Sequence, residues 1–161
     1  PAQVNAEVEK EAQSIAVRIA ETSEFIGLLA VELFLTQDGK LLVNEIAPRP
    51  HNSGHHTIEA CTTSQYEQHL RAILSMPLGE TRLIEPAVMI NLLGEPGFEG
   101  PAFYSGLEEA LHMPGVHVHL YGKTTTKPFR KMGHITVTDT SLTAAQERAR
   151  KVMQLVKVQS C

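Results

Sequence analysis

Residues 28–46 read LLAVELFLTQDGKLLVNEI, two apolar and β-rich runs joined by a short polar segment. Asp38-Gly39 lies between the runs, and Asp-Gly in this position is a strong short-range signal of a β-hairpin. If these two residues form a two-residue turn, Gln37 pairs with Lys40 and the register of both strands is set. The segment therefore predicts an antiparallel hairpin.

The predicted register places Glu32 directly opposite Glu45. Like charges in this position are unfavourable, and the apolar character of both strands would make the charges more costly. A shared hard cation would remove the conflict, because Mg²⁺ is commonly held by one or two carboxylates plus substrate phosphates. The alternative is an edge hairpin whose glutamates simply point into water.

The hairpin is followed by APRPHNSGHH at residues 47–56, a polar segment that two prolines make less flexible. Arg49 offers a forked donor suited to carboxylate or phosphate. Asn52 and Ser53 can hydrogen-bond a small oxyanion, and Gly54 permits close approach of the backbone. Taken alone, the segment could equally be a polar surface loop.

Two strings of this sequence carry a family resemblance. Residues 43–55, VNEIAPRPHNSGH, with Glu32 upstream in VELF, resemble the C-terminal half of an ATP-grasp domain, specifically that of the N5-carboxyaminoimidazole ribonucleotide synthetases. YGK at 121–123, followed by RKMGH at 130–134, resembles the same family. The related formate-dependent glycinamide ribonucleotide transformylases show Arg-Pro-His-Asp-Thr-Gly where this chain has residues 49–54, which makes them the alternative.

The resemblance implies an ATP-dependent ligase of purine biosynthesis, homodimeric as the full-length enzyme. It would form carboxyphosphate from bicarbonate and ATP and pass the carboxyl group to 5-aminoimidazole ribonucleotide. Glu32 and Glu45 would hold Mg²⁺, and Asn44 would join Glu45 at the ATP phosphates. The carboxyphosphate and aminoimidazole side would be lined by Arg49, His51, Asn52 and Ser53. The phosphate of the ribonucleotide would be bound by Lys123 and Arg130, although the intervening segment TTTKPF lacks the acidic and arginine residues typical of that loop.

Hydrophobic periodicity predicts an α+β fold. Apolar residues at helical spacing indicate a helix from Ala6 to about Glu24 and another from about Ser64 to Ser75. The second helix is expected to bury Tyr66, Leu70, Ile73 and Leu74. Shorter elements follow, namely strands at 87–93, 116–121 and 135–138, a short helix at 107–111 and a closing helix at 144–156. We expect residues 1–80 to be the C-terminal lobe of an ATP-grasp domain, an antiparallel sheet with helices, and residues 81–161 a small, β-rich α/β domain.

Composition excludes several classes of protein. The net charge is -4, and the local basic excess between Lys123 and Lys131 is too small for a nucleic-acid surface. No apolar run approaches the roughly 20 residues that span a bilayer. Cys61 and Cys161 form no disulfide framework, so a reducing, cytoplasmic location is expected.

The sequence opens at Pro1 without methionine and contains no glycine-rich phosphate loop. We therefore expect a C-terminal fragment that is inactive alone.

The eight histidines suggest a transition-metal module as a different function. His51, His55 and His56 cluster, and His117-Val118-His119 places two imidazoles on one strand face, but no third ligand follows at a convincing spacing. His134 fits a structural role and a substrate-side role equally well. A non-catalytic dimerisation domain would fit residues 81–161 alone and leave the glutamate pair unexplained.

Overall fold

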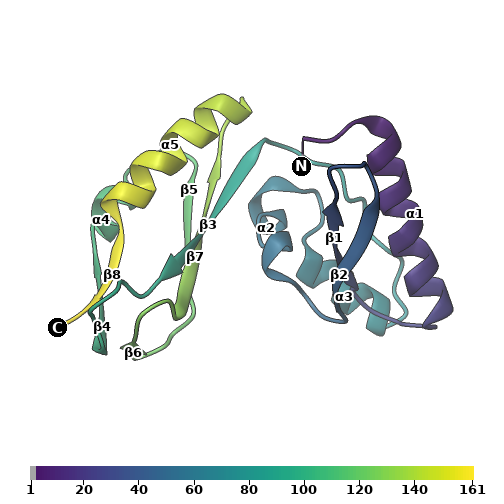
Figure 1. Ribbon diagram of the computed structural model, residues 1–161. Helices are drawn as coiled ribbons and strands as arrows, with labels where there is room; N and C mark the ends of the chain where they lie inside the picture. Colours follow the sequence, from purple (N-terminus) through teal and green to yellow (C-terminus); the bar gives the residue numbers. More distant parts are fainter. Residues whose placement is uncertain (1–2) are drawn as a thin grey trace. The chain divides into compact units, whose positions relative to one another are not determined.

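The computed structural model describes residues 3–161, which form two compact units. The first unit contains residues 3–54 and 63–80, and the second contains residues 55–62 and 81–161. Each combines helices with antiparallel sheets, so the α+β class predicted from the sequence is confirmed (Figure 1). The chain passes from one unit to the other three times, whereas the sequence predicted a single boundary at residue 80.

The helices are α1 (Ala6–Thr22), η1 (Asn52–Gly54, a 3₁₀ turn), α2 (Thr57–Ala60), α3 (Gln65–Ile73), α4 (Leu107–Leu111) and α5 (Leu142–Leu155). The strands are β1 (Ala30–Leu35), β2 (Leu41–Ala47), β3 (Ala87–Leu93), β4 (Gly100–Ser105), β5 (Val116–Leu120), β6 (Thr125–Thr126), β7 (Lys131–Thr138) and β8 (Lys157–Ser160). Within residues 3–161, no helix combines the length and apolar character needed to cross a membrane.

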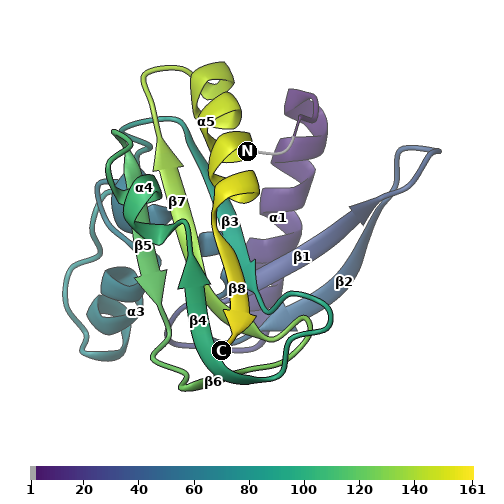
Figure 2. The ribbon, with the colours of Figure 1, turned by 90° about the vertical axis from the view of Figure 1, so that its left-hand side faces the viewer.

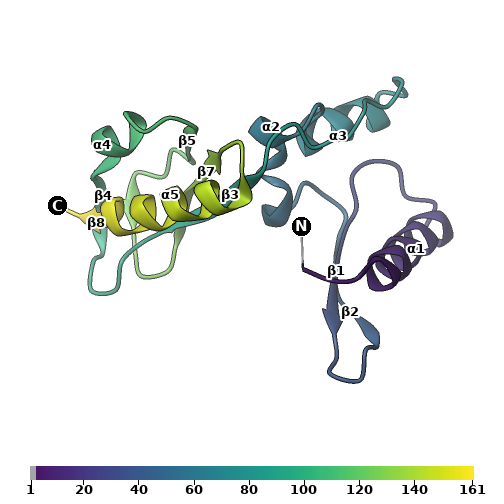
Figure 3. The ribbon, with the colours of Figure 1, turned by 90° about the horizontal axis from the view of Figure 1, so that it is seen from above.

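In the first unit, α1 lies against both strands of the β1–β2 hairpin (Figure 3). Asn5 caps α1, because its side chain accepts a hydrogen bond from the Val8 amide at 2.9 Å. Ser64 caps α3 in the same way, accepting from the Glu67 amide at 3.2 Å. Both helices therefore begin where a capping residue satisfies a backbone donor.

The predicted buried face of α3 is wrong. Its apolar side chains are 39–63% exposed, namely Tyr66, Leu70, Ile73 and Leu74. The adjoining polar face makes the contacts, since Gln65, Gln68 and His69 hydrogen-bond the backbone of loops in the same unit. Periodicity thus located the helix and its two faces but not the face that packs.

The β1–β2 turn differs by one residue from the predicted turn. The Gly39 amide donates to the Thr36 carbonyl at 3.0 Å, and the Thr36 amide donates to the Lys40 carbonyl at 2.9 Å. Gly39 has φ 84°, a left-handed conformation that closes a three-residue loop. Thr36, and not Gln37, therefore lies opposite Lys40.

The second unit contains two three-stranded sheets, β3-β7-β5 and β6-β4-β8. Helix α5 packs on β3 and β7 (Figure 2). Ile135 and Val137 of β7 join Val152 of α5 in the buried core. The alternate residues His134 and Thr136 lie on the other face of β7, which helix α2 also contacts. One face of β7 is therefore apolar, and its other face presents polar side chains that are nonetheless buried.

Candidate functional site

Glu32 and Glu45 lie directly opposite one another on β1 and β2, as the sequence predicted. The register shifts by one residue between Glu32 and Leu33, which leaves Asn44 as an extra residue on β2. This β-bulge offsets the shift that the three-residue turn introduces. The predicted pairing is therefore correct although the predicted turn is not.

Both carboxylates are accessible to solvent. Their side chains are 43% exposed for Glu32 and 50% exposed for Glu45. The prediction that apolar surroundings make these charges more costly is therefore wrong. The unfavourable contribution that remains is the repulsion between the two carboxylates. Asn44 reduces that repulsion, because its Nδ2 donates a hydrogen bond to Glu32 Oε2 at 3.3 Å.

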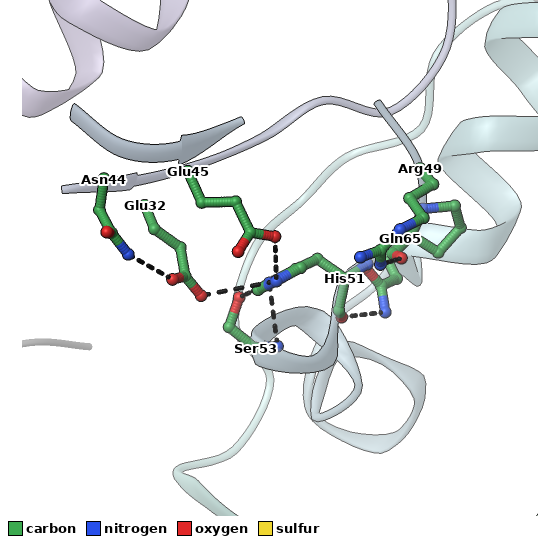
Figure 4. A network of polar contacts seen from close by, with 8 residues as sticks. Glu32, Asn44, Glu45, Arg49, His51, Ser53 and Gln65 are labelled. Atoms are coloured by element: carbon green, nitrogen blue, oxygen red, sulfur yellow. Dashed lines mark hydrogen bonds and ion pairs between the residues drawn. The ribbon is translucent and has the colours of Figure 1, made fainter. Parts of the chain in front are cut away.

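His51 lies beside the carboxylate pair (Figure 4). Its Nε2 is 3.5 Å from Glu32 Oε1 and 3.8 Å from Glu45 Oε1. Its Nδ1 is 2.8 Å from the hydroxyl of Ser53, and the residue is buried. The imidazole is thus oriented by Ser53 on one side and directed at both carboxylates on the other.

Arg49 and Asn52 complete the set of residues predicted on this loop. Arg49 Nη1 donates to the carbonyl of Pro50 at 3.0 Å. Asn52 opens the 3₁₀ turn η1 and is half-buried. The structure therefore joins five of the predicted residues into one network and places these two beside it; the five are Glu32, Asn44, Glu45, His51 and Ser53.

The donor set suits a hard cation shared with a substrate. Two accessible carboxylates converge, and oxygen ligands of this kind hold Mg²⁺ together with phosphate oxygens and water. Over residues 3–161, no three or more His, Cys, Asp and Glu side chains are arranged to hold a metal ion by themselves. The histidine-based metal module therefore has no support in this part of the chain.

Lys123 and Arg130 belong to the second unit and are half-buried. Lys123 Nζ donates to the carbonyl of Lys131 and lies 5.8 Å from the ring centroid of Tyr121. Arg130 Nη1 donates to the carbonyl of Thr125 at 2.9 Å. Their role as a phosphate site facing the Arg49 loop stays a prediction.

The second unit also contains a stack of three imidazoles that the sequence did not predict. His134 lies between His55 and His119, with ring centroids 4.6 Å and 4.4 Å away. Glu59 Oε1 is 2.6 Å from His119 Nε2, and the Tyr121 hydroxyl is 3.0 Å from His134 Nδ1. The only signal in the sequence was the alternation of His117 and His119, which does not reveal the partners of either residue.

His134 is 2% exposed. Burial, together with the neighbouring His119 and His55, lowers the pKa of His134 to about 4, against a smaller opposing effect of Glu59. Its Nε2 is buried and has no hydrogen-bond partner among the residues that the structure describes. His134 is therefore a buried imidazole that stays neutral at physiological pH.

Known proteins share both parts of this chain. Residues 1–66 match the ATP-grasp domain family, and residues 87–148 match the phosphoribosylaminoimidazole carboxylase C-terminal domain. The N5-carboxyaminoimidazole ribonucleotide synthase of Bacillus subtilis is 49% identical over 139 residues, covering 84% of this chain. The crystal structure of the N5-carboxyaminoimidazole ribonucleotide synthetase from Thermotoga maritima matches 100% of this chain with a TM-score of 0.95 and 53% identity. This chain belongs to the N5-carboxyaminoimidazole ribonucleotide synthetase family.

The synthetase family is the one that residues 43–55 resemble, so that resemblance is confirmed. The Aspergillus clavatus synthase, solved in complex with ADP and 5-aminoimidazole ribonucleotide, matches 95% of this chain with a TM-score of 0.81 and 36% identity. The chain spans 34% of the Bacillus relative, 45% of the Thermotoga chain and 41% of the Aspergillus chain. It corresponds to the C-terminal portion of a synthetase.

Proposed function

We propose that this chain supplies the C-terminal part of the active site of an ATP- and Mg²⁺-dependent ligase that carboxylates 5-aminoimidazole ribonucleotide with bicarbonate. The observation that carries the proposal is the convergence of Glu32, Glu45 and His51. Further support comes from 53% identity, over the whole of this chain, to a synthetase of the same family.

In this proposal Glu32 and Glu45 hold Mg²⁺, and Asn44 orients Glu32 through its hydrogen bond. Mg²⁺ held there would supply positive charge against the phosphates of ATP. The half-exposed position of both carboxylates suits this role, because a metal ion could reach them from solvent.

Two group transfers follow. An oxygen of bicarbonate attacks the γ-phosphorus of ATP, the bond to ADP breaks, and carboxyphosphate forms. The amine of 5-aminoimidazole ribonucleotide then attacks the carboxyl carbon, inorganic phosphate leaves, and the nitrogen loses a proton. The second transfer takes place beside four residues of the loop after β2, namely Arg49, His51, Asn52 and Ser53. Hydrogen-bond donors held in fixed positions near the developing negative charge stabilise the transition state.

Lys123 and Arg130 bind the phosphate of the ribonucleotide in this proposal. A forked guanidinium and a point-charge ammonium together suit a phosphate dianion. The basic residues of segment 123–131 support the assignment. The same proposal includes a homodimeric full-length enzyme and a cytoplasmic location. Sedimentation velocity of the full-length enzyme would test whether it is a dimer.

A chimera tests the proposed function directly. The matching portion of the Thermotoga synthetase is replaced by this chain, which is feasible at 53% identity and a TM-score of 0.95. We expect ADP release that requires both bicarbonate and 5-aminoimidazole ribonucleotide, and we expect the Glu45→Gln chimera to lack it. A chimera that melts like its parent but releases no ADP under these conditions contradicts the proposal.

A further inference from the structure

The side-chain amide of Gln65, at the start of α3, makes two hydrogen bonds to the backbone of His51. The His51 amide donates to Gln65 Oε1 at 2.9 Å, and Gln65 Nε2 donates to the His51 carbonyl at 2.9 Å. Gln65 is 7% exposed, so this amide is a buried polar group whose donor and acceptor are both used. The two residues are 14 positions apart, and the contact therefore fixes a loop and not a local turn.

Gly54 makes room for this amide. A Cβ atom on Gly54 would lie 2.4 Å from Gln65 Oε1 and 2.7 Å from its Cδ. The Gly54 amide also donates to the His51 carbonyl at 2.9 Å, so that carbonyl receives two donors. The turn from His51 to Gly54 is thus folded around the Gln65 side chain, and any larger residue at position 54 would displace it.

The clamped residue carries the imidazole that lies beside the carboxylates (Figure 4). With its backbone held at both the amide and the carbonyl, His51 has only its side-chain torsions left to set the direction of Nε2. The Ser53 hydroxyl restrains those torsions through Nδ1 at 2.8 Å. Backbone and ring are therefore fixed by separate contacts, as precise placement of a reacting group requires.

We propose that Gln65 is a positioning residue, which acts through His51 and holds its imidazole against the Glu32–Glu45 pair. This inference rests on the proposed function for the reaction that His51 serves, but the clamp itself can be tested without activity. Gln65 does not touch the carboxylates, so its effect on catalysis is indirect.

Helix α3 contains its own control. Gln68, one turn further on, clamps Gly79 with the same geometry, since Gln68 Nε2 donates to the Gly79 carbonyl at 2.8 Å and the Gly79 amide donates to Gln68 Oε1 at 2.8 Å. Gly79 is not one of the predicted site residues. Gln65→Met and Gln68→Met therefore each remove a reciprocal pair of hydrogen bonds to the backbone from one helix, and only the first pair lies at the site.

The activity test uses both variants in the Thermotoga chimera. We expect Gln65→Met to lower kcat by about 10- to 100-fold with KM for ATP changed less than about two-fold, because misplacement by about 1 Å costs up to about a hundredfold. We expect Gln68→Met to leave kcat within about two-fold of the unsubstituted chimera. It should lower the melting temperature by about as much as Gln65→Met does. Equal losses of kcat in the two variants would show a general stability effect and overturn the proposal.

Amide hydrogen exchange on the 161-residue chain tests the clamp independently. Gln65→Ala should speed exchange of the His51 amide by at least about tenfold and leave the Gly79 amide unchanged. In the wild-type background, Gly54→Ala should also speed exchange of the His51 amide. In the Gln65→Ala background it should raise that rate little further, because the side-chain amide that the added methyl group would displace is already absent. Unchanged His51 exchange, or additive effects of the two substitutions, would refute the clamp. A chimera that melts like its parent but is inactive would contradict the proposed function and leave this exchange result to decide the role of Gln65.

Discussion

Glu32 faces Glu45 across the β1–β2 hairpin because two single-residue irregularities cancel. The three-residue turn shifts the ladder by one position, and the bulge at Asn44 shifts it back. The bulge also changes where neighbouring side chains point. Consecutive residues of a regular strand point to opposite faces of the sheet. Here Asn44 and Glu45 both reach the same group of side chains, with Asn44 bonded to Glu32 (Figure 4). The irregularity is therefore part of the candidate site.

The first prediction concerns the two carboxylates. Glu32→Gln and Glu45→Gln should each lower turnover of the chimera by at least about a hundredfold, because a metal ligand is lost from a site that stabilises developing charge. The melting temperature of the metal-free chain should stay the same or rise slightly, since a repulsion between half-exposed groups is removed. Steady-state kinetics across a Mg²⁺ titration, with thermal melts beside them, would measure both effects.

Glu11→Gln, on the exposed surface of α1, is the matched control for these substitutions. It removes one carboxylate of the same unit and should leave turnover and its Mg²⁺ dependence unchanged. Wild-type turnover in either Glu32→Gln or Glu45→Gln would contradict the metal assignment.

The hairpin illustrates how far the sequence could lead. The two apolar, β-rich runs on either side of Asp38-Gly39 sufficed to predict two paired strands and the facing glutamates. The turn length and the bulge were not predictable, because both depend on local backbone choices that the pattern of residue types does not record. The pairing survived because the two errors have opposite signs.

Long-range contacts account for the rest of what the sequence did not predict. The His134 stack depends on the register of β5 against β7, which sets His119 beside His134, and on residues 55–62, which add His55. Strand β8 was missed because it follows α5 directly, with Val156 between them and no turn residue to mark the change. Elements with strong local periodicity were predicted, whereas those defined by distant partners were not.

The second prediction concerns the basic segment of the second unit. Arg130→Ala in the chimera should raise KM for 5-aminoimidazole ribonucleotide by about 10- to 100-fold, the effect of losing a charge-assisted hydrogen bond worth about 1.5–3 kcal/mol. KM for ATP should change less than about two-fold. Lys127→Ala, an exposed cation of the same loop, is the control and should have a much smaller effect on either constant. Equal increases for both substrates in Arg130→Ala would argue against a phosphate contact.

The third prediction concerns the 161-residue polypeptide by itself. It spans 34% of its Bacillus relative, and its sequence includes no glycine-rich phosphate loop, so we expect no bicarbonate-dependent ATP hydrolysis. Phosphate release assayed at high protein concentration, with the chimera as positive control, would measure this. Hydrolysis that persists after purification and disappears in Glu45→Gln would show that the polypeptide holds a complete nucleotide site.

The fourth prediction is a pH dependence of stability that originates at His134. Because burial and two flanking imidazoles lower the pKa of His134 from 6.5 to about 4 in the folded chain, the unfolded chain binds this proton first as the pH falls. The contribution of His134 is therefore fully present above about pH 6.5 and is lost progressively between about pH 6.5 and pH 4. Its total size is about 3 kcal/mol by the linkage relation. Urea unfolding of the 161-residue chain at several pH values would measure the slope.

His134→Asn separates this contribution from that of the carboxylates that titrate in the same range. Asparagine can still hydrogen-bond the Tyr121 hydroxyl, which lies 3.0 Å from His134 Nδ1, but it cannot take up a proton. We expect the variant to be less stable at pH 7, because the stacking with His55 and His119 is lost, and to lose less stability than the wild type on going to pH 4. His117→Asn replaces an exposed histidine on the same face of β5 as His119 and should keep the wild-type slope. If His134→Asn also keeps the wild-type slope, the proton is taken up elsewhere and His134 is not the buried neutral group that its surroundings imply.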